Sequence, residues 1–175
     1  MQTPGSGAGA RPDQLGRAAS PTLVYVDGAS LGNPGPAGVA VVIQHSGAEG
    51  MEPEATVAEP IGTATNNEAE YRALIRALEE CRRLRLSRIR VHMDSELVLK
   101  QVKGHYRVKD PKLLPLYMRV RELLQSFPGA EVSLLRREDN KLANNLAQNA
   151  ARAGEARPPS NAPPPEGAGS PPGGA

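Results

Sequence analysis

The feature that most constrains the fold is an apolar run that ends in one acid, Val24-Tyr25-Val26-Asp27, followed by a turn-forming segment up to Gly35. An apolar run bounded by turn residues predicts a buried strand. Asp27 is expected at the point where this strand emerges into solvent. We therefore interpret Asp27 as a candidate functional carboxylate.

Length and composition indicate one domain with a substantial core, because the chain has 175 residues and 39% of them are hydrophobic. The formal net charge of +2 neither requires nor excludes a nucleic-acid partner. Cys81 is the single cysteine, which rules out an internal disulfide and a cysteine-based zinc site and favours a reducing, cytoplasmic location. No segment has the apolar length of a membrane span.

Both ends of the chain are expected to be disordered tails around one domain at residues 21–152. Residues 1–20 have no hydrophobic periodicity, and residues 153–175 are rich in Pro, Gly and Ala. Such segments bury too little apolar surface to offset the entropy lost on ordering. A polyproline ligand around Pro163-Pro164-Pro165 is the alternative interpretation of the C-terminal tail.

The first half of the domain predicts three antiparallel strands followed by a helix. The second strand lies in Ala37 to Gln44, after the turn, and a weaker third strand lies within Ala55 to Gly62. Thr65 and Glu68 have the spacing of a capping box, and apolar residues then recur with helical periodicity from Tyr71 to Cys81.

The second half predicts two further strands and three helices. Arg88 to Asp94 alternates polar and apolar residues, as a half-buried strand does, and again ends in Asp. Helical patterns follow at Ser95 to Lys103 and Lys112 to Phe127, then a short strand at Glu131 to Arg136 and a last helix around Leu142 to Ala150. The fold class is therefore α/β, with a five-stranded mixed sheet flanked by helices.

The two strand-end acids point to a metal site. If the strands that end in Asp27 and Asp94 are parallel neighbours, their carboxylates lie about 5 Å apart at the carboxyl edge of the sheet, where open α/β sheets place their sites. Carboxylates without nearby His or Cys ligands favour Mg²⁺ or Mn²⁺ over zinc. A third ligand on the first helix is expected among four acids that periodicity does not separate: Glu68, Glu70, Glu79 and Glu80.

Four segments together resemble, in order and spacing, the type 1 ribonuclease H family, in its short prokaryotic form without a basic protrusion. They cover essentially the whole predicted domain. They are Asp27-Gly28-Ala29-Ser30-Leu31-Gly32-Asn33-Pro34-Gly35, Thr65-Asn66-Asn67-Glu68-Ala69-Glu70, Met93-Asp94-Ser95, and Arg137-Glu138-Asp139-Asn140-Lys141-Leu142-Ala143-Asn144-Asn145-Leu146-Ala147.

The resemblance implies a ribonuclease H-like fold and an endonuclease that hydrolyses the RNA strand of RNA–DNA hybrids. In that family four acids hold two divalent ions, here Mg²⁺ or Mn²⁺, and the products carry 5′-phosphate and 3′-hydroxyl ends. By motif, Asp27, Glu70 and Asp94 are the catalytic and metal-binding residues. The Thr-Asn-Asn pattern selects Glu70 over Glu68.

The fourth catalytic and metal-binding position departs from the family, because Asn144 stands where the resemblance implies Asp. An amide oxygen can coordinate a hard cation but brings no negative charge, so weaker metal affinity is expected. Asn144 is either a natural variant or an engineered substitution. The alternative function is a catalytically impaired hybrid-binding module of the same fold.

The same motifs imply the substrate-binding residues. The small residues Gly28, Ala29 and Ser30 would let the backbone approach the RNA and its 2′-hydroxyl groups. Contacts to bases, sugars or a DNA phosphate are implied at the turn and at the start of the helix, by Asn33, Thr65, Asn66 and Asn67. The expected partner is the hybrid alone, with no membrane and no protein partner, and the expected state is a monomer.

Overall fold

The computed structural model describes residues 20–47 and 52–156, which form one five-stranded sheet in the order β3-β2-β1-β4-β5. The strands are β1 (Thr22–Ser30), β2 (Gly35–His45), β3 (Ala55–Ala64), β4 (Ile89–Met93) and β5 (Glu131–Leu134). The helices are α1 (Asn66–Arg83), α2 (Glu96–Val102), α3 (Leu113–Leu124) and α4 (Lys141–Glu155), with a short 3₁₀ turn at Arg137–Asp139.

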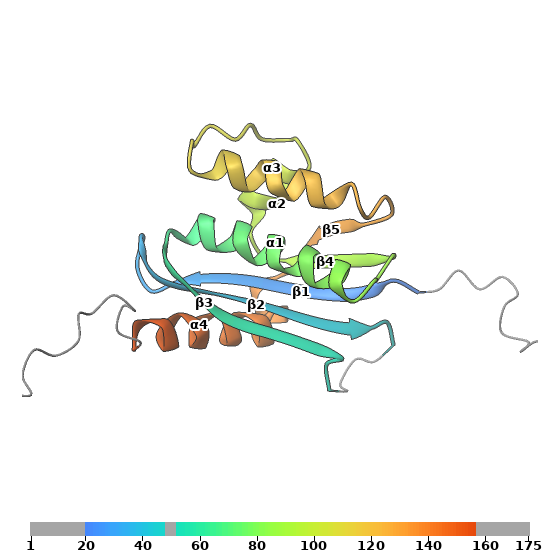
Figure 1. The fold of residues 1–175 in the computed structure, drawn as a ribbon, viewed down its shortest axis with the longest axis horizontal. Helices are drawn as coiled ribbons and strands as arrows, with labels where there is room; N and C mark the ends of the chain where they lie inside the picture. Colours follow the sequence, from blue (N-terminus) through green and yellow to red (C-terminus); the bar gives the residue numbers. More distant parts are fainter. Residues whose placement is uncertain (1–19, 48–51, 157–175) are drawn as a thin grey trace, which may run out of the picture.

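The pairing of the strands confirms the predicted mixed sheet. Strands β1, β2 and β3 are antiparallel neighbours, whereas β4 runs parallel to β1 and β5 runs parallel to β4. Helix α1 connects β3 to β4 and covers one face together with α2 and α3, while α4 covers the other face (Figure 1). This architecture places the carboxyl ends of β1 and β4 side by side.

Helix α1 begins where its capping box predicts. The Thr65 hydroxyl accepts the backbone N–H of Glu68, and the Glu68 carboxylate accepts the backbone N–H of Thr65 at 2.7 Å. These two bonds satisfy helix N–H groups that otherwise lack partners. The buried stripe of α1 includes Tyr71, Leu74 and Leu78, which pack into the main core against the strands.

Two glycines let the helices approach the central strands closely. A Cβ at Gly28 of β1 would lie 2.2 Å from the backbone of Ala69 in α1, and a Cβ at Gly38 of β2 would lie 2.5 Å from the backbone of Ala147 in α4. Atoms do not approach this closely without displacement, so each position requires glycine. The sequence motifs indicated Gly28 only as a possible contact to RNA and did not indicate a role for Gly38.

The structure corrects the expected position of Asp27. We predicted that the strand ends there and that Asp27 emerges into solvent, but β1 continues to Ser30 and Asp27 is only 1% exposed. The reason is pairing with β2, which continues from Asp27↔Ala40 to Ser30↔Ala37 after the pairing with β4 has stopped.

The described elements run from β1, which begins at Thr22, to α4, which ends at Glu155, three residues past the expected domain boundary at 152. The predicted tails, residues 1–20 and 153–175, lie almost entirely outside the described residues. Over residues 20–47 and 52–156, no helix has the length and apolar character needed to cross a membrane.

Candidate active site

The site forms where β4 ends beside a strand that continues. The parallel pairing of β1 with β4 extends only to Tyr25↔His92, and β4 stops at Met93. Asp27 therefore lies beside the end of β4, and Asp94 is the first residue after it. The sequence predicted this juxtaposition from the parallel strands, and the structure confirms it.

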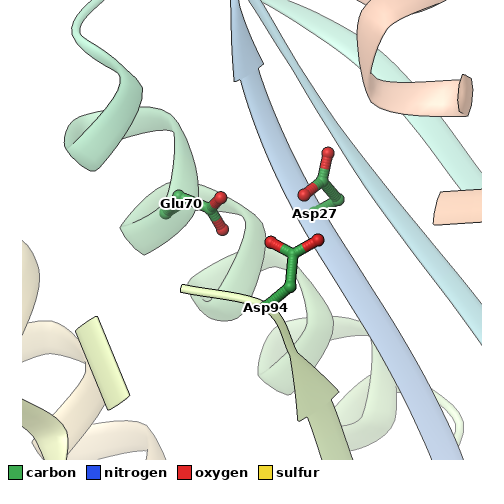
Figure 2. Close-up of side chains that lie close together, drawn as sticks. All are labelled: Asp27, Glu70 and Asp94. Carbon is green, nitrogen blue, oxygen red and sulfur yellow. The ribbon is translucent and has the colours of Figure 1, made fainter. Parts of the chain in front are cut away.

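Three carboxylates from three different elements meet at this place. Asp27 of β1, Glu70 of α1 and Asp94 after β4 each offer an oxygen, and these oxygens all lie within 4.8 Å of one another. Figure 2 shows the three side chains pointing toward a common centre. Gly28 is essential to this arrangement, because its missing side chain allows the backbone of Glu70 to approach β1.

The mutual repulsion of these acids is visible in their pKa values. Burial, followed by the charge of Asp94, raises the pKa of Asp27 to about 7. Burial, followed by the charges of Asp27 and Asp94, raises the pKa of Glu70 well above its usual value, although the backbone N–H of Gly28 opposes this rise. The folded chain therefore holds these carboxylates in a place that favours a positive charge between them.

Four of the six carboxylate oxygens of the cluster also lack hydrogen-bond donors in the described residues. Both carboxylate oxygens of Asp27, Oε2 of Glu70 and Oδ2 of Asp94 are buried without a partner among residues 20–47 and 52–156. Buried carboxylate oxygens are ordinarily satisfied, so exceptions call for an ion or ligand. An all-oxygen donor set with three negative charges fits hard divalent cations such as Mg²⁺ and Mn²⁺.

The other acids that were candidates on α1 lie apart from this cluster. Glu68 completes the capping box, Glu79 pairs with Arg119 at 3.0 Å, and Glu80 pairs with two arginines. Of the four candidates, only Glu70 points toward Asp27.

Asn144 lies on α4, and its side chain is buried, with 8% exposed. The two atoms of its amide group differ in their hydrogen bonding. Its Oδ1 accepts a hydrogen bond of 2.6 Å from Nε2 of Gln148, one turn along the helix, whereas its Nδ2 is buried without a partner in the described part of the chain. One turn earlier, the side-chain nitrogen of Asn140 donates to the backbone oxygen of Val26 at 2.9 Å and ties α4 to β1 directly before Asp27. Sequence reasoning missed Gln148, although its position four residues after Asn144 was a usable signal.

The predicted substrate-binding residues divide into two groups. Gly28 and Ala29 are buried in β1, and the half-buried Ser30 donates its hydroxyl proton to the backbone oxygen of Ala64 at 2.8 Å. The others lie at the start of α1 and in the turn before β2. There the side-chain oxygen of Asn33 accepts the backbone N–H of Asn66 at 3.2 Å, Thr65 caps the helix, and Asn67 is half-buried.

One arginine places positive charge near the cluster. Arg137, in the turn before α4, lowers the pKa of both Asp27 and Glu70 and so partly offsets the effects of burial and repulsion. Its neighbour Arg136 is instead paired with Asp139 at 2.8 Å. A cation at the rim of an acidic site is suitably placed to contact a phosphate.

Comparison with known proteins identifies relatives of this arrangement. Residues 25–150 match a family described as reverse transcriptase-like. A ribonuclease HI of Halobacterium salinarum is 42% identical over 140 residues, which cover 80% of this chain and 67% of that protein. The bifunctional protein Rv2228c of Mycobacterium tuberculosis is 39% identical over 131 residues, or 75% of this chain, but the chain spans only 35% of its length.

Solved structures agree with the sequence relatives. The RNase H1 of Halobacterium salinarum superposes with a TM-score of 0.71 at 39% identity, covering 77% of this chain and 99% of that one. LC11-RNase H1, solved in complex with an RNA/DNA hybrid, superposes with a TM-score of 0.69 at 36% identity, covering 75% of this chain and 97% of that one. The residues that the family match spans, 25–150, include α1, the carboxylate cluster and all of the sheet except the first residues of β1.

Proposed function

The chain belongs to the type 1 ribonuclease H family, and from that premise we propose that it is an endonuclease that hydrolyses the RNA strand of RNA–DNA hybrids with divalent metal ions. The observation that carries the proposal is the cluster of Asp27, Glu70 and Asp94. One oxygen from each lies within 4.8 Å of the others, and four of their six carboxylate oxygens are buried without a donor in the described residues. A relative in this family has been solved with an RNA/DNA hybrid.

The proposed catalytic and metal-binding residues are Asp27, Glu70, Asp94 and Asn144, with two Mg²⁺ or Mn²⁺ ions. Bound ions would supply an activated water and stabilise the leaving 3′-oxygen, which gives 5′-phosphate and 3′-hydroxyl products. The chain's own part is to hold three carboxylates at fixed positions on rigid elements and to keep the site pre-organised. Asp27 is held most firmly, because both β2 and the Asn140 bond to Val26 fix its strand.

Substrate contacts are proposed at the surface beside the cluster. Asn33 and Asn66 lie next to each other and are exposed, so together with Asn67 they would reach the minor groove of the hybrid. The N-terminus of α1 at Thr65 would bind a DNA phosphate. Backbone groups of Gly28, Ala29 and Ser30 would contact the RNA, with Arg137 facing the phosphate that is cleaved.

A cleavage assay tests the proposal. The purified chain is incubated with an end-labelled RNA–DNA hybrid while Mg²⁺ and, separately, Mn²⁺ are titrated, with the same duplexes in RNA–RNA and DNA–DNA form as controls. We expect metal-dependent cuts in the RNA strand of the hybrid. The Asp94→Asn variant, which removes one charge from the cluster without changing its size, should retain the fold and lose cleavage.

A hybrid-binding module that does not cleave is the second candidate function, and the neutral Asn144 favours it. This alternative predicts a gel shift with the hybrid at every metal concentration and no cleavage product. Absence of product from the wild-type chain in both metals, with binding intact, would establish the module and refute the enzyme.

We also propose that the chain works as a monomer in the cytoplasm. The large apolar side chains that are exposed are scattered over separate elements, among them Tyr106, Met118 and Leu142, which is ordinary for a monomer surface. The free thiol of Cys81 is buried and fits a reducing compartment. Light scattering of the purified chain measures the oligomeric state.

A further inference from the structure

The side of β1 that carries Asp27 faces helix α4. Side chains alternate along a strand, so Tyr25, Asp27 and Ala29 share one face. Tyr25 lines a cavity with Asn140 of α4, and Ala29 packs against Ala147 of the same helix. Asp27 lies between these two contacts and therefore faces the part of α4 between residues 140 and 147.

Two buried side chains of α4 lie in this interval, Ala143 and Asn144, and Asn144 is the polar one. It lies one turn after Asn140 and nearly one turn before Ala147, on the same buried face. Its Oδ1 is directed along the helix to Gln148, which donates to it at 2.6 Å. The other amide atom, Nδ2, is buried and is the half of the group left to face Asp27, since nothing in the described chain bonds it.

This orientation matters because the two halves of an amide have opposite preferences. The oxygen accepts hydrogen bonds and coordinates hard cations, whereas the NH₂ group carries partial positive charge and only donates. With Oδ1 held by Gln148, Asn144 presents a donor toward the carboxylates. Such a donor stabilises the negative charge of Asp27 or of a bound phosphate, but it opposes a cation at the same place.

Gln148 is suited to control this choice, because it carries both a donor and an acceptor. If both amides turn over, Nδ2 of Asn144 donates to Oε1 of Gln148, and Oδ1 of Asn144 faces the site. The pair therefore has two arrangements with one hydrogen bond in each. Metal coordination by Asn144 requires the second arrangement.

We propose that Gln148 is a positioning residue that decides which amide atom Asn144 presents to the carboxylate cluster, and so sets how strongly the site holds a divalent ion. The proposal rests on the metal-dependent function proposed above. A residue at position 148 that can only accept, or only donate, a hydrogen bond should fix the orientation of the Asn144 amide. Gln148→Glu only accepts and turns the oxygen of Asn144 toward the site, whereas Gln148→Lys only donates and keeps the nitrogen there.

The experiment measures Mn²⁺ binding by calorimetry on the full chain without substrate at pH 8. Added charge at residue 148 also changes metal affinity directly, so each replacement is repeated in an Asn144→Ala background, where no amide remains to orient. We expect Gln148→Glu to tighten Mn²⁺ binding by about fivefold more with Asn144 present than with Ala at that position. Gln148→Lys should weaken it by a similarly larger factor when Asn144 is present.

Equal effects of the Gln148 replacements in both backgrounds would overturn the proposal, as would a failure of both single variants to differ from wild type. Residue 148 is only half-buried, so these variants should fold, and thermal melting of each confirms it. The calorimetry does not depend on cleavage. Loss of hybrid cleavage with Mn²⁺ binding intact would refute the proposed function alone, whereas equal Gln148 effects with cleavage intact would refute this inference alone.

Discussion

Helix α1 carries two buried carboxylates whose pKa values are shifted in opposite directions. Glu70 is 3% exposed and Glu80 is 4% exposed, and both lie on faces of α1 that contact the rest of the domain. Around Glu80, Arg83 and Arg76 donate to the carboxylate, and the bond from Arg83, followed by that from Arg76, lowers its pKa to about 2. Around Glu70 there are instead two further acids, and its pKa is raised.

The difference shows that burial of an acid does not by itself indicate a functional site. Glu80 is buried and satisfied, so the folded state gains from its charge. Glu70 is buried with like charges around it, so the metal-free folded state is penalised by its ionisation. A fold keeps an arrangement of the second kind where a ligand compensates it, and this is the physical argument for a cation site at Glu70.

The most direct test of the difference between Glu70 and Glu80 is to replace each with Gln, which removes the charge at nearly constant size. We expect Glu70→Gln to lower hybrid cleavage in Mg²⁺ by about 1000-fold, since a group that holds the catalytic ions supplies on the order of 4 kcal/mol of transition-state stabilisation. Glu80→Gln should leave the cleavage rate per folded molecule within about twofold of wild type, because Glu80 lies apart from the carboxylate cluster. Equal losses of cleavage rate for the two variants in single-turnover assays would contradict this difference between Glu70 and Glu80.

The second prediction concerns the pH dependence of stability without metal. The pKa of Asp27 is raised from 3.8 to about 7, so between these pH values the folded state keeps a proton that the unfolded state has lost. Stability should therefore be full below pH 4 on account of this group and fall as pH rises to 7, by about 4 kcal/mol. Glu70 acts in the same direction.

Denaturant titrations in EDTA at pH 5 and pH 8 measure this fall. The window lies above the ordinary pKa of Glu80, so the arginine-paired acid does not contribute. In Asp27→Asn the fall should shrink markedly, and in wild type a divalent ion should reverse it, because the ion takes the place of the proton. A wild-type protein that is more stable at pH 8 than at pH 5 without metal would contradict the assignment.

Glu80 gives the opposite sign and a smaller effect. Its pKa is lowered, so it contributes stability that is present above its ordinary pKa of 4.5 and is lost as pH falls toward 2. At pH 7 we expect Glu80→Gln to lower the free energy of unfolding by about 1.5 kcal/mol, which is the value of hydrogen bonds to a charged group. Arg83→Gln, which leaves the bond from Arg76, should cost less in the same denaturant titration.

The sequence predicted the helices and strands better than the burial of the side chains that they carry. The three antiparallel strands, the capping box at Thr65 and the juxtaposition of Asp27 with Asp94 follow from local patterns and from the geometry of parallel strands. The burial of Asp27 does not, because it depends on how far the pairing with β2 continues past the end of β4. A local sequence pattern does not show that the pairing of β1 with β4 stops before its pairing with β2.

The choice among the acids of α1 was open for the same reason. Helical periodicity placed Glu68, Glu70, Glu79 and Glu80 on neighbouring faces, and only the family resemblance selected Glu70. The acids that select Glu70, Asp27 and Asp94, are remote in sequence, as is Arg119 of α3, which pairs with Glu79. Glu68 and Glu80 instead have partners within four residues along the chain. The role of Gly38 in admitting α4 likewise depends on a helix more than one hundred residues away.

The smallest expected effect comes from Glu68, two residues before Glu70, and it gives the comparison its most stringent control. Hydrogen bonding to the backbone N–H of Thr65 lowers the pKa of Glu68, so this carboxylate is satisfied like Glu80, although it lies next to the site. Gln also completes a capping box, so Glu68→Gln removes only the attraction of a charge to the helix N-terminus, about 0.5 kcal/mol. Cleavage and Mn²⁺ affinity should both stay within about twofold of wild type, as an exposed charge change of this size predicts. A large loss of metal affinity in Glu68→Gln would mean that proximity to the cluster, and not the absence of donors, decides which acids of α1 hold the ion.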